Sequence, residues 1–181
     1  MPLFLIGYMA SGKTTFGSAL AKKLKLPFID LDEYIEGSLG FSISEIFKEK
    51  GEPGFREIER KMLQEVAAHE NAIIACGGGT PCFFDNLMLM KSKGKTVYLK
   101  SSVDVLTSRL EASNSKRPLM AGKNRKEIET TIKRQLEVRE PYYNNADIIW
   151  DSDKLESEEE IESNISDFIA AYPFVFSTPF I

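Results

Sequence analysis

The chain has 181 residues, 43% of them hydrophobic and 28% charged, which is typical of a folded globular domain and argues against a disordered chain. Its 27 acidic and 23 basic residues give a net charge of −4, which argues against a general nucleic-acid binder that depends on counterion release. No apolar run approaches the roughly 20 residues that cross a bilayer, so we expect no membrane partner. The length predicts one domain over residues 1–181.

Five short apolar runs alternate with helical patterns along the chain. We expect strands at residues 2–6, 28–30, 72–76, 96–99 and 147–150. The first run is nearly all apolar, which is typical of a strand buried on both faces of a parallel sheet. Strands that alternate with helices predict an α/β fold with right-handed crossovers.

The first strand is followed by a phosphate-binding pattern. Residues 7–14, Gly-Tyr-Met-Ala-Ser-Gly-Lys-Thr, match G-x-x-x-x-G-K-[ST] between a strand and a helix, where the backbone N–H groups can bind phosphate oxygens. In such a loop Lys13 would neutralise the β- and γ-phosphates, and the Thr14 hydroxyl would coordinate Mg²⁺. The alternative is a chance glycine-rich turn. No Asn-Lys-x-Asp element that reads guanine is visible, which argues against a GTPase.

Two carboxylates, Asp30 and Asp32, lie at the end of the second strand. One can face Thr14 and the hydrated magnesium ion, while the other can align or deprotonate an acceptor hydroxyl. The alternative is that both residues cap the helix that follows, since Asp favours that position. Capping and catalysis are compatible.

The connection between the second and third strands is longer than one crossover helix needs. Its helical patterns, at residues 42–50 and 55–69, lead us to expect a substrate-binding insertion at residues 33–61. Arg56 lies near the start of the second pattern, where a positive charge opposes the helix dipole. Either the carboxylate of a substrate or a salt bridge to Glu52 or Glu59 would hold it there.

Two further segments follow the third and fourth strands. Residues 77–79 are three glycines at the sheet edge where α/β proteins bind ligands, and a substrate can approach their backbone N–H groups; a flexible turn is the alternative. Residues 112–125 predict a lid loop in which Arg117 stabilises a transferred phosphoryl group. Arg139 ends a later helix, where a positive charge is favourable without any ligand.

The acidic charge of the chain is concentrated near the C-terminus. Residues 151–167 contain eight acidic residues and one lysine, a local charge of −7, so the remainder carries +3. Ile161, Ile165 and Phe168 repeat at helical spacing, which predicts a packed helix with a solvated acidic face. For the aromatic tail at residues 172–181, packing on the domain, contact with a partner and a loose conformation all stay open.

The two cysteines, Cys76 and Cys82, are too few for a disulfide framework and lack zinc-site spacing, so we expect reduced thiols. No basic segment precedes the apolar N-terminal residues, so we expect no signal peptide. Both observations indicate a cytoplasmic protein.

The order of these motifs resembles that of the shikimate kinases, and the match runs from about residue 3 to residue 150. It depends on Gly7 to Thr14, Asp30-Leu31-Asp32, Gly51-Glu52, Phe55-Arg56, Glu59, Gly77-Gly78-Gly79, Arg117-Pro118-Leu119, Arg139, Pro141 and Tyr143. One departure is Cys76, where the family pattern leads us to expect Thr. The resemblance implies a three-layer P-loop kinase fold whose five parallel strands, in the order 2-3-1-4-5, are flanked by helices.

The resemblance also implies an activity, transfer of the γ-phosphoryl group of ATP to the 3-hydroxyl of shikimate in aromatic amino acid biosynthesis. The residues that it implies for shikimate are Asp32, Arg56, Gly78, Gly79 and Arg139. Those that it implies for the nucleotide are Gly12, Lys13, Thr14, Thr15, Arg117 in the lid and Arg109 at the adenine. It places Mg²⁺ at Thr14 and Asp30, and it implies catalytic roles for Lys13, Asp32 and Arg117. We expect a monomer whose partners are ATP and shikimate.

Two other functions are alternatives to this one. A related kinase could act on another polyol acid such as gluconate, but the glycines at 77–79 with Arg56 and Arg139 favour shikimate. A nucleotide-binding regulatory module without catalysis is disfavoured because Lys13, Asp30 and Asp32 are all retained.

Overall fold

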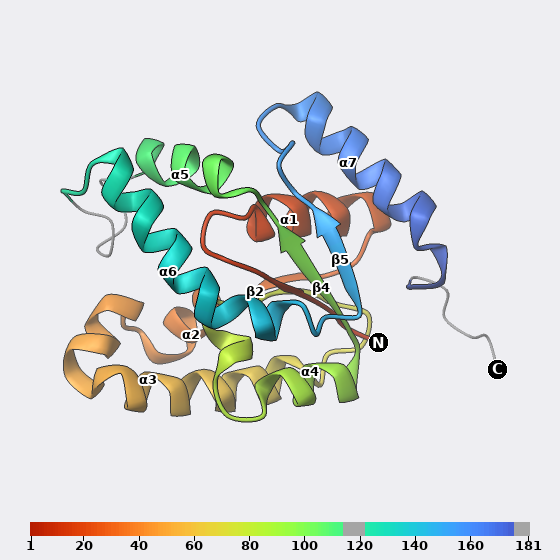
Figure 1. Ribbon diagram of the computed structural model, residues 1–181. Coiled ribbons are helices and arrows are strands. Elements are labelled where there is room, and N and C mark those ends of the chain that lie inside the picture. The colour runs from red at the N-terminus through yellow and green to blue at the C-terminus, as the bar shows by residue number, and fades with distance from the viewer. Residues whose placement is uncertain (114–121, 176–181) are drawn as a thin grey trace.

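The computed structural model describes residues 1–113 and 122–175. They form an α/β fold around a five-stranded parallel sheet (Figure 1). The strands are β1 (Leu3–Ile6), β2 (Phe28–Asp30), β3 (Ile73–Ala75), β4 (Lys95–Lys100) and β5 (Ile148–Asp151). Their order, β2-β3-β1-β4-β5, confirms the predicted topology.

Helices follow the strands in the expected alternation. They are α1 (Lys13–Leu24), α2 (Leu31–Leu39), α3 (Ile43–Val66), α4 (Asn86–Lys93), α5 (Val103–Ala112), α6 (Arg125–Tyr143) and α7 (Glu158–Ala171). Two 3₁₀ turns, η1 (Thr80–Cys82) and η3 (Pro173–Val175), complete the described elements. Within residues 1–113 and 122–175, no helix is long and apolar enough to cross a membrane.

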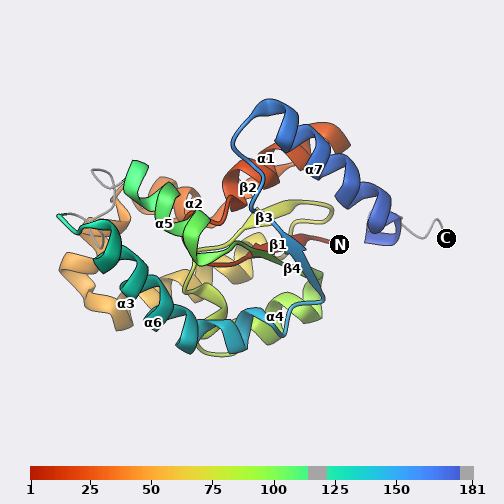
Figure 2. The ribbon, with the colours of Figure 1, turned by 45° about the horizontal axis from the view of Figure 1, so that its top comes forward.

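The sheet is the middle layer of three, with helices on both of its faces, and the side chains of β1 contribute to the core on each side. These side chains alternate between the faces, so that Leu3 and Leu5 join one buried cluster while Phe4 and Ile6 join the other. The first cluster is covered by α1 and α7, and the second by α2, α3, α4, α5 and α6 (Figure 2). All four residues are buried, as their continuous apolar run predicted.

The long connection after β2 contains α2 and then α3, and α3 consists of two helical segments on either side of a kink, as the two helical patterns predicted. α3 begins with a capping box between Ser42 and Glu45 and is interrupted at Gly51, whose φ of 67° and ψ of −179° are not helical. Pro53 lies just after this break, where a missing backbone N–H does little harm. The helix ends at Val66, before the predicted end at residue 69.

The last strand is displaced by one residue from its predicted range of 147–150. Asp147 lies outside β5, and its Oδ2 accepts hydrogen bonds from the backbone N of Thr96 at 2.9 Å and from its Oγ1 at 2.8 Å. The side chain of Asp147 therefore joins the start of β5 to β4, in place of a backbone hydrogen bond between the two strands.

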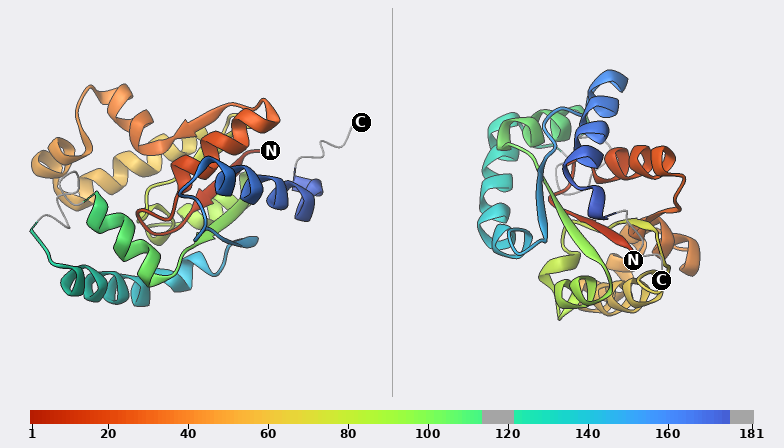
Figure 3. Two further views of the ribbon diagram at one scale, coloured as in Figure 1. Left: turned by 90° about the horizontal axis from the view of Figure 1, so that it is seen from above. Right: turned by 90° about the vertical axis from the view of Figure 1, so that its right-hand side faces the viewer.

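The acidic segment near the C-terminus forms α7, as predicted. Ser157 caps this helix, and Ile165 and Phe168 are buried while the acidic residues face outward or are half-buried. The helix lies beside α1 (Figure 3), where the rings of Phe16 and Phe168 meet edge to face at 5.2 Å. Of the tail, residues 172–175 are described, and the rest lies outside the described residues.

Gly94, which follows α4, fits directly against the N-terminal residues. A Cβ at this position would lie 2.0 Å from the carbonyl oxygen of Pro2, which also accepts a hydrogen bond from Lys95 N at 3.1 Å. Because backbone must move to relieve this overlap, we expect Gly94→Ala to lower the free energy of unfolding by about 1–3 kcal/mol, measured by urea denaturation.

Gly37→Ala is the matched control for Gly94→Ala, because nothing lies within 4 Å of the Cβ that it adds in α2. Alanine has the higher helix propensity, so this variant should be as stable as the original chain or up to about 1 kcal/mol more stable. Equal urea midpoints for the two variants would contradict the proposed overlap.

Candidate active site

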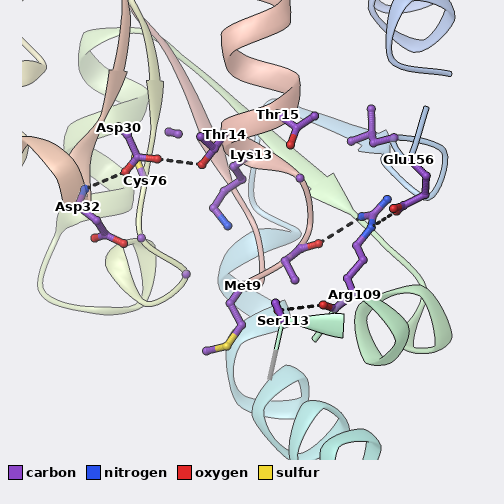
Figure 4. Close-up of a pocket in the computed structure, with 16 residues that line it drawn as sticks. Met9, Lys13, Thr14, Thr15, Asp30, Asp32, Cys76, Arg109, Ser113 and Glu156 are labelled. Atoms are coloured by element: carbon purple, nitrogen blue, oxygen red, sulfur yellow. Dashed lines mark hydrogen bonds and ion pairs between the residues drawn. The ribbon is translucent and has the colours of Figure 1, made fainter. Parts of the chain in front are cut away.

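A cavity of about 380 Å³ lies at the carboxyl ends of β1, β2 and β3. Several of the predicted site residues line it, namely Gly12, Lys13, Thr14, Thr15, Asp30, Asp32, Gly78 and Arg109. In Figure 4, Lys13, Thr14, Asp30 and Asp32 lie on one side, with Arg109 and Glu156 on the other. The strand ends thus bring together motifs that are far apart in the sequence.

The phosphate-binding loop closes around the side chain of its own lysine. Lys13 Nζ donates to the carbonyl oxygens of Gly7 at 3.0 Å and Tyr8 at 2.9 Å. Ala10 and Gly12 adopt φ values of 65° and 89°, which turn the backbone into the start of α1. The sequence pattern leaves the position of Ala10 unrestricted, so this left-handed alanine was not foreseen.

Asp30 has two hydrogen-bond partners in the site. Its Oδ2 accepts from Thr14 Oγ1 at 2.9 Å, and its Oδ1 accepts from the backbone N of Asp32 at 3.1 Å, which caps α2. Both predicted roles, capping and contact with Thr14, are therefore found in this one residue. Asp32 lies in the first turn of α2 and does not cap it, so the alternative of two capping residues was wrong.

The carboxyl group of Asp32 has a raised pKa. Its pKa is raised from 3.8 to about 6, mainly by burial and also by the charges of Asp30 and Glu59, while Lys13 acts in the opposite direction. A carboxyl group with a pKa near neutrality can accept a proton under working conditions and release it again. Asp32 is therefore the candidate base of the site.

The raised pKa of Asp32 also predicts an effect on stability. In the unfolded chain the group ionises near 3.8 and in the fold near 6, so the free energy of unfolding falls as the pH rises through this window. Asp32→Asn cannot ionise, so its free energy of unfolding does not fall in this way. In metal-free buffer at about pH 8 we expect the variant to be more stable by about 1–3 kcal/mol, with a smaller gap near pH 5.

Urea denaturation of both proteins across this pH range measures the effect. A variant less stable than the original chain at the higher pH would contradict the proposed cost of ionising Asp32.

Arg56 is buried, with 7% of its surface exposed. Its Nη1 donates to Glu59 Oε2 at 2.8 Å and its Nη2 to Glu52 Oε1 at 3.1 Å, so both predicted salt bridges are present. The guanidinium also lies 4.0 Å from the ring centroid of Phe83. Its Nε is buried without an acceptor among the described residues, which leaves a donor for a ligand.

The glycine loop lies against both arginines of the predicted acceptor site. A Cβ on Gly79 would lie 2.5 Å from Arg56 Nη2, and one on Gly78 would lie 3.7 Å from Arg139 Nη1. Tyr143 Oη, one turn after Arg139 in α6, donates to the carbonyl oxygen of Gly78. The fold therefore brings α3, α6 and the loop after β3 together.

Tyr143 was not foreseen as an anchor of the loop. Its spacing of four residues from Arg139 places both on one helix face, and that signal was available in the sequence. At Cys76, where Thr was expected, the thiol is buried and the backbone N donates to Leu5 O at 3.0 Å, which continues the pairing with β1.

Arg109 joins the phosphate-binding loop to the segment after β5. It donates to the carbonyl oxygens of Ala10 at 3.2 Å and of Ser152 and Asp153 at 3.0 Å each, and its Nε donates to Glu156 Oε1 at 2.6 Å. Its role at the adenine stays a prediction. Arg117 lies outside the described residues, so its position in the lid was not tested.

The parallel sheet in this order, with a phosphate-binding loop, two carboxylates and a glycine loop at its carboxyl edge, defines a P-loop kinase. Residues 9–170 match the family model of shikimate kinase. The chain belongs to the shikimate kinase family, whose members are ATP-dependent phosphotransferases.

Individual relatives agree with this assignment. A shikimate kinase from Bacteroides thetaiotaomicron is 49% identical over 163 residues, which cover 90% of this chain and 93% of the relative. One from Parabacteroides distasonis is 50% identical over 159 residues, covering 88% and 92%.

Two solved structures extend the similarity to the fold. The crystal structure of the Bacteroides thetaiotaomicron enzyme has a TM-score of 0.92 and 46% identity, covering 96% of this chain and 98% of that one. The shikimate kinase from Acinetobacter baumannii in complex with shikimate has a TM-score of 0.82 and 29% identity, covering 96% and 93%.

Proposed function

We propose that this chain transfers the γ-phosphoryl group of ATP to the 3-hydroxyl of shikimate, giving shikimate 3-phosphate and ADP. The observation that carries the proposal is the placement of Asp32. Its carboxyl group, with a pKa of about 6, lines the same cavity as Lys13 and Gly78. A carboxyl group with a pKa near neutrality thus shares a cavity with a phosphate-binding lysine and a loop that two arginines approach.

On the acceptor side, Arg56 and Arg139 would bind the carboxylate of shikimate. The buried Nε of Arg56 supports this role, since a ligand oxygen would give it the acceptor that it lacks among the described residues. Gly78 and Gly79 would let the substrate approach the backbone, because a Cβ on Gly79 would crowd Arg56 and one on Gly78 would lie 3.3 Å from the backbone N of Met9. Asp32 would face the reacting hydroxyl.

On the nucleotide side, the phosphates would lie on the N-terminus of α1. Gly12, Thr14 and Thr15 would supply backbone N–H groups and hydroxyls, and Lys13 would exchange its carbonyl partners for phosphate oxygens. Arg109 would contact the adenine from the opposite side of the cavity. Arg117, outside the described residues, is assigned to the lid.

The hydroxyl of Thr14 and the carboxylate of Asp30 fit a magnesium site. Both are oxygen donors, and they already lie 2.9 Å apart. Within residues 1–113 and 122–175 no group of three or more His, Cys, Asp or Glu residues could hold a metal ion. The proposed ion would be held largely by phosphate oxygens and water. When bound, Mg²⁺ would neutralise charge on the β- and γ-phosphates.

In the proposed reaction, the oxygen of the 3-hydroxyl of shikimate forms a bond to the γ-phosphorus of ATP. Asp32 accepts the proton of that hydroxyl at the same time. The bond between that phosphorus and the bridging oxygen breaks, and its electron pair leaves with ADP. Lys13 stabilises the charge that accumulates on the transferred group. Asp32 then returns its proton to solvent.

A coupled assay of ADP release with ATP and either shikimate or gluconate tests the proposal. We expect turnover with shikimate, little with gluconate, and slow hydrolysis of ATP without an acceptor. Turnover of gluconate but not of shikimate would assign another polyol acid, and no turnover of either would favour a regulatory module.

The remaining assignments are proposals of the same kind. We propose that the protein is a monomer in the cytoplasm. Residues 33–61, which include most of α2 and most of α3, would bind the acceptor, and residues 112–125 would form the lid. Size-exclusion chromatography with light scattering tests the monomer.

A further inference from the structure

Thr80 is a buried residue that the proposed reaction leaves without a role. Its Oγ1 donates a hydrogen bond of 2.6 Å to Glu59 Oε1, while the other oxygen of Glu59 accepts from Arg56 Nη1 at 2.8 Å. Thr80 is 0% exposed and Glu59 is 1% exposed, so water cannot replace either partner. The three side chains form a chain of contacts that ends at a proposed acceptor arginine.

The hydroxyl is held in place by backbone contacts that do not depend on it. Thr80 begins η1, its backbone N donates to Gly77 O at 3.1 Å, and its carbonyl oxygen accepts from Asn86 Nδ2 at 2.9 Å. Replacing Thr80 by the isosteric valine therefore removes a donor and leaves the path of the loop intact.

The contact lies beside the reacting carboxylate. A Cβ on Gly77 would lie 3.0 Å from Thr80 Oγ1 and 3.1 Å from both Glu59 Oε1 and Asp32 Oδ1. The absence of a side chain at Gly77 allows all three to approach, so the hydroxyl acts where the acceptor would be held.

Glu59 needs a donor for each of its oxygens because it is a buried carboxylate. Thr80 supplies one, so Glu59 contacts Arg56 through Oε2 alone. Without the hydroxyl of Thr80, Oε1 of Glu59 has no hydrogen-bond donor. Glu59 can regain one by turning so that both of its oxygens accept from the guanidinium of Arg56. That movement would change the position of Arg56 at the acceptor carboxylate.

We propose that Thr80 is a positioning residue for shikimate, which acts by occupying one oxygen of Glu59 and so fixing the guanidinium of Arg56. The inference rests on the proposed function. It makes Thr80 a determinant of acceptor affinity with no part in nucleotide binding.

The test compares Thr80→Val with Thr80→Ser in steady-state kinetics. We expect Thr80→Val to raise KM for shikimate by about tenfold, with KM for ATP and kcat within about twofold of the original values. Thr80→Ser keeps the hydroxyl and should restore KM for shikimate. An unchanged KM for shikimate in Thr80→Val, an equal rise for ATP, or no rescue by serine would overturn the proposal.

A second background tests the route through Arg56. Arg56→Lys alone should lower kcat/KM for shikimate, and adding Thr80→Val should then cost less than about twofold. A tenfold fall in kcat/KM for shikimate when Thr80→Val is added to Arg56→Lys would overturn the proposal. If Arg56→Lys has no effect, the assignment of Arg56 in the proposed function fails instead, so the two failures are distinguishable. Thr80→Ala serves as the hydroxyl-free variant if thermal unfolding shows that valine disrupts the fold.

Discussion

Asp32→Asn is expected to lower kcat for shikimate phosphorylation by about 100- to 10,000-fold, the range that a positioned general base contributes. The amide has nearly the shape of the carboxyl group but cannot accept the proton of the acceptor hydroxyl. Because the phosphate-binding loop is untouched, KM for ATP should stay within about twofold. Coupled-assay kinetics with both substrates varied measure these quantities.

The control for this variant is Glu33→Gln, the same chemical change at the next residue of α2, where the side chain is exposed. It should leave kcat unchanged. If Asp32→Asn turned over at a near-normal rate, Asp32 would have no part in proton transfer. Combined with the stability measurement at pH 8, the variant should be both more stable and nearly inactive, which would show that the ionised carboxylate is kept for catalysis.

Lys13→Met is expected to impair both substrate binding and chemistry. The ammonium group of Lys13 would contact the phosphates in the ground state and stabilise charge in the transition state. We expect kcat to fall by about 100- to 1,000-fold, as when one preorganised donor is removed, and KM for ATP to rise by about tenfold or more.

The control is Lys22→Met, which removes an exposed lysine from the last turn of the same helix and should change neither constant. Unchanged use of ATP by Lys13→Met would contradict the assignment of residues 7–14 to the phosphates. Equilibrium binding of ADP to both variants separates the loss of affinity from the loss of rate.

The fold was predictable because its signals are local and periodic. Each strand is an apolar run, and the phosphate-binding loop marks the end of the first. Boundaries were less predictable where a tertiary contact decides them. Asp147 joins β4 through Thr96, which lies 51 residues away. The break in α3 at Gly51, by contrast, falls between the two helical patterns that the sequence shows.

The site was predictable where a motif fixes the chemistry, as with Lys13 and the contact between Thr14 and Asp30. Other contacts join common residue types across long separations, so they leave no pattern. The bond from Thr80 to Glu59 spans 21 residues, that from Tyr143 to Gly78 spans 65, and that from Arg109 to Ala10 spans 99.

The contacts of Arg109 have a consequence for the order in which the protein is made. The phosphate-binding loop is among the first segments of the chain to be synthesised, yet the arginine that holds Ala10 also needs the carbonyl oxygens of Ser152 and Asp153. A nascent chain therefore carries its phosphate-binding residues early, but Arg109 can join them to the segment after β5 only once residues 152 and 153 have been synthesised.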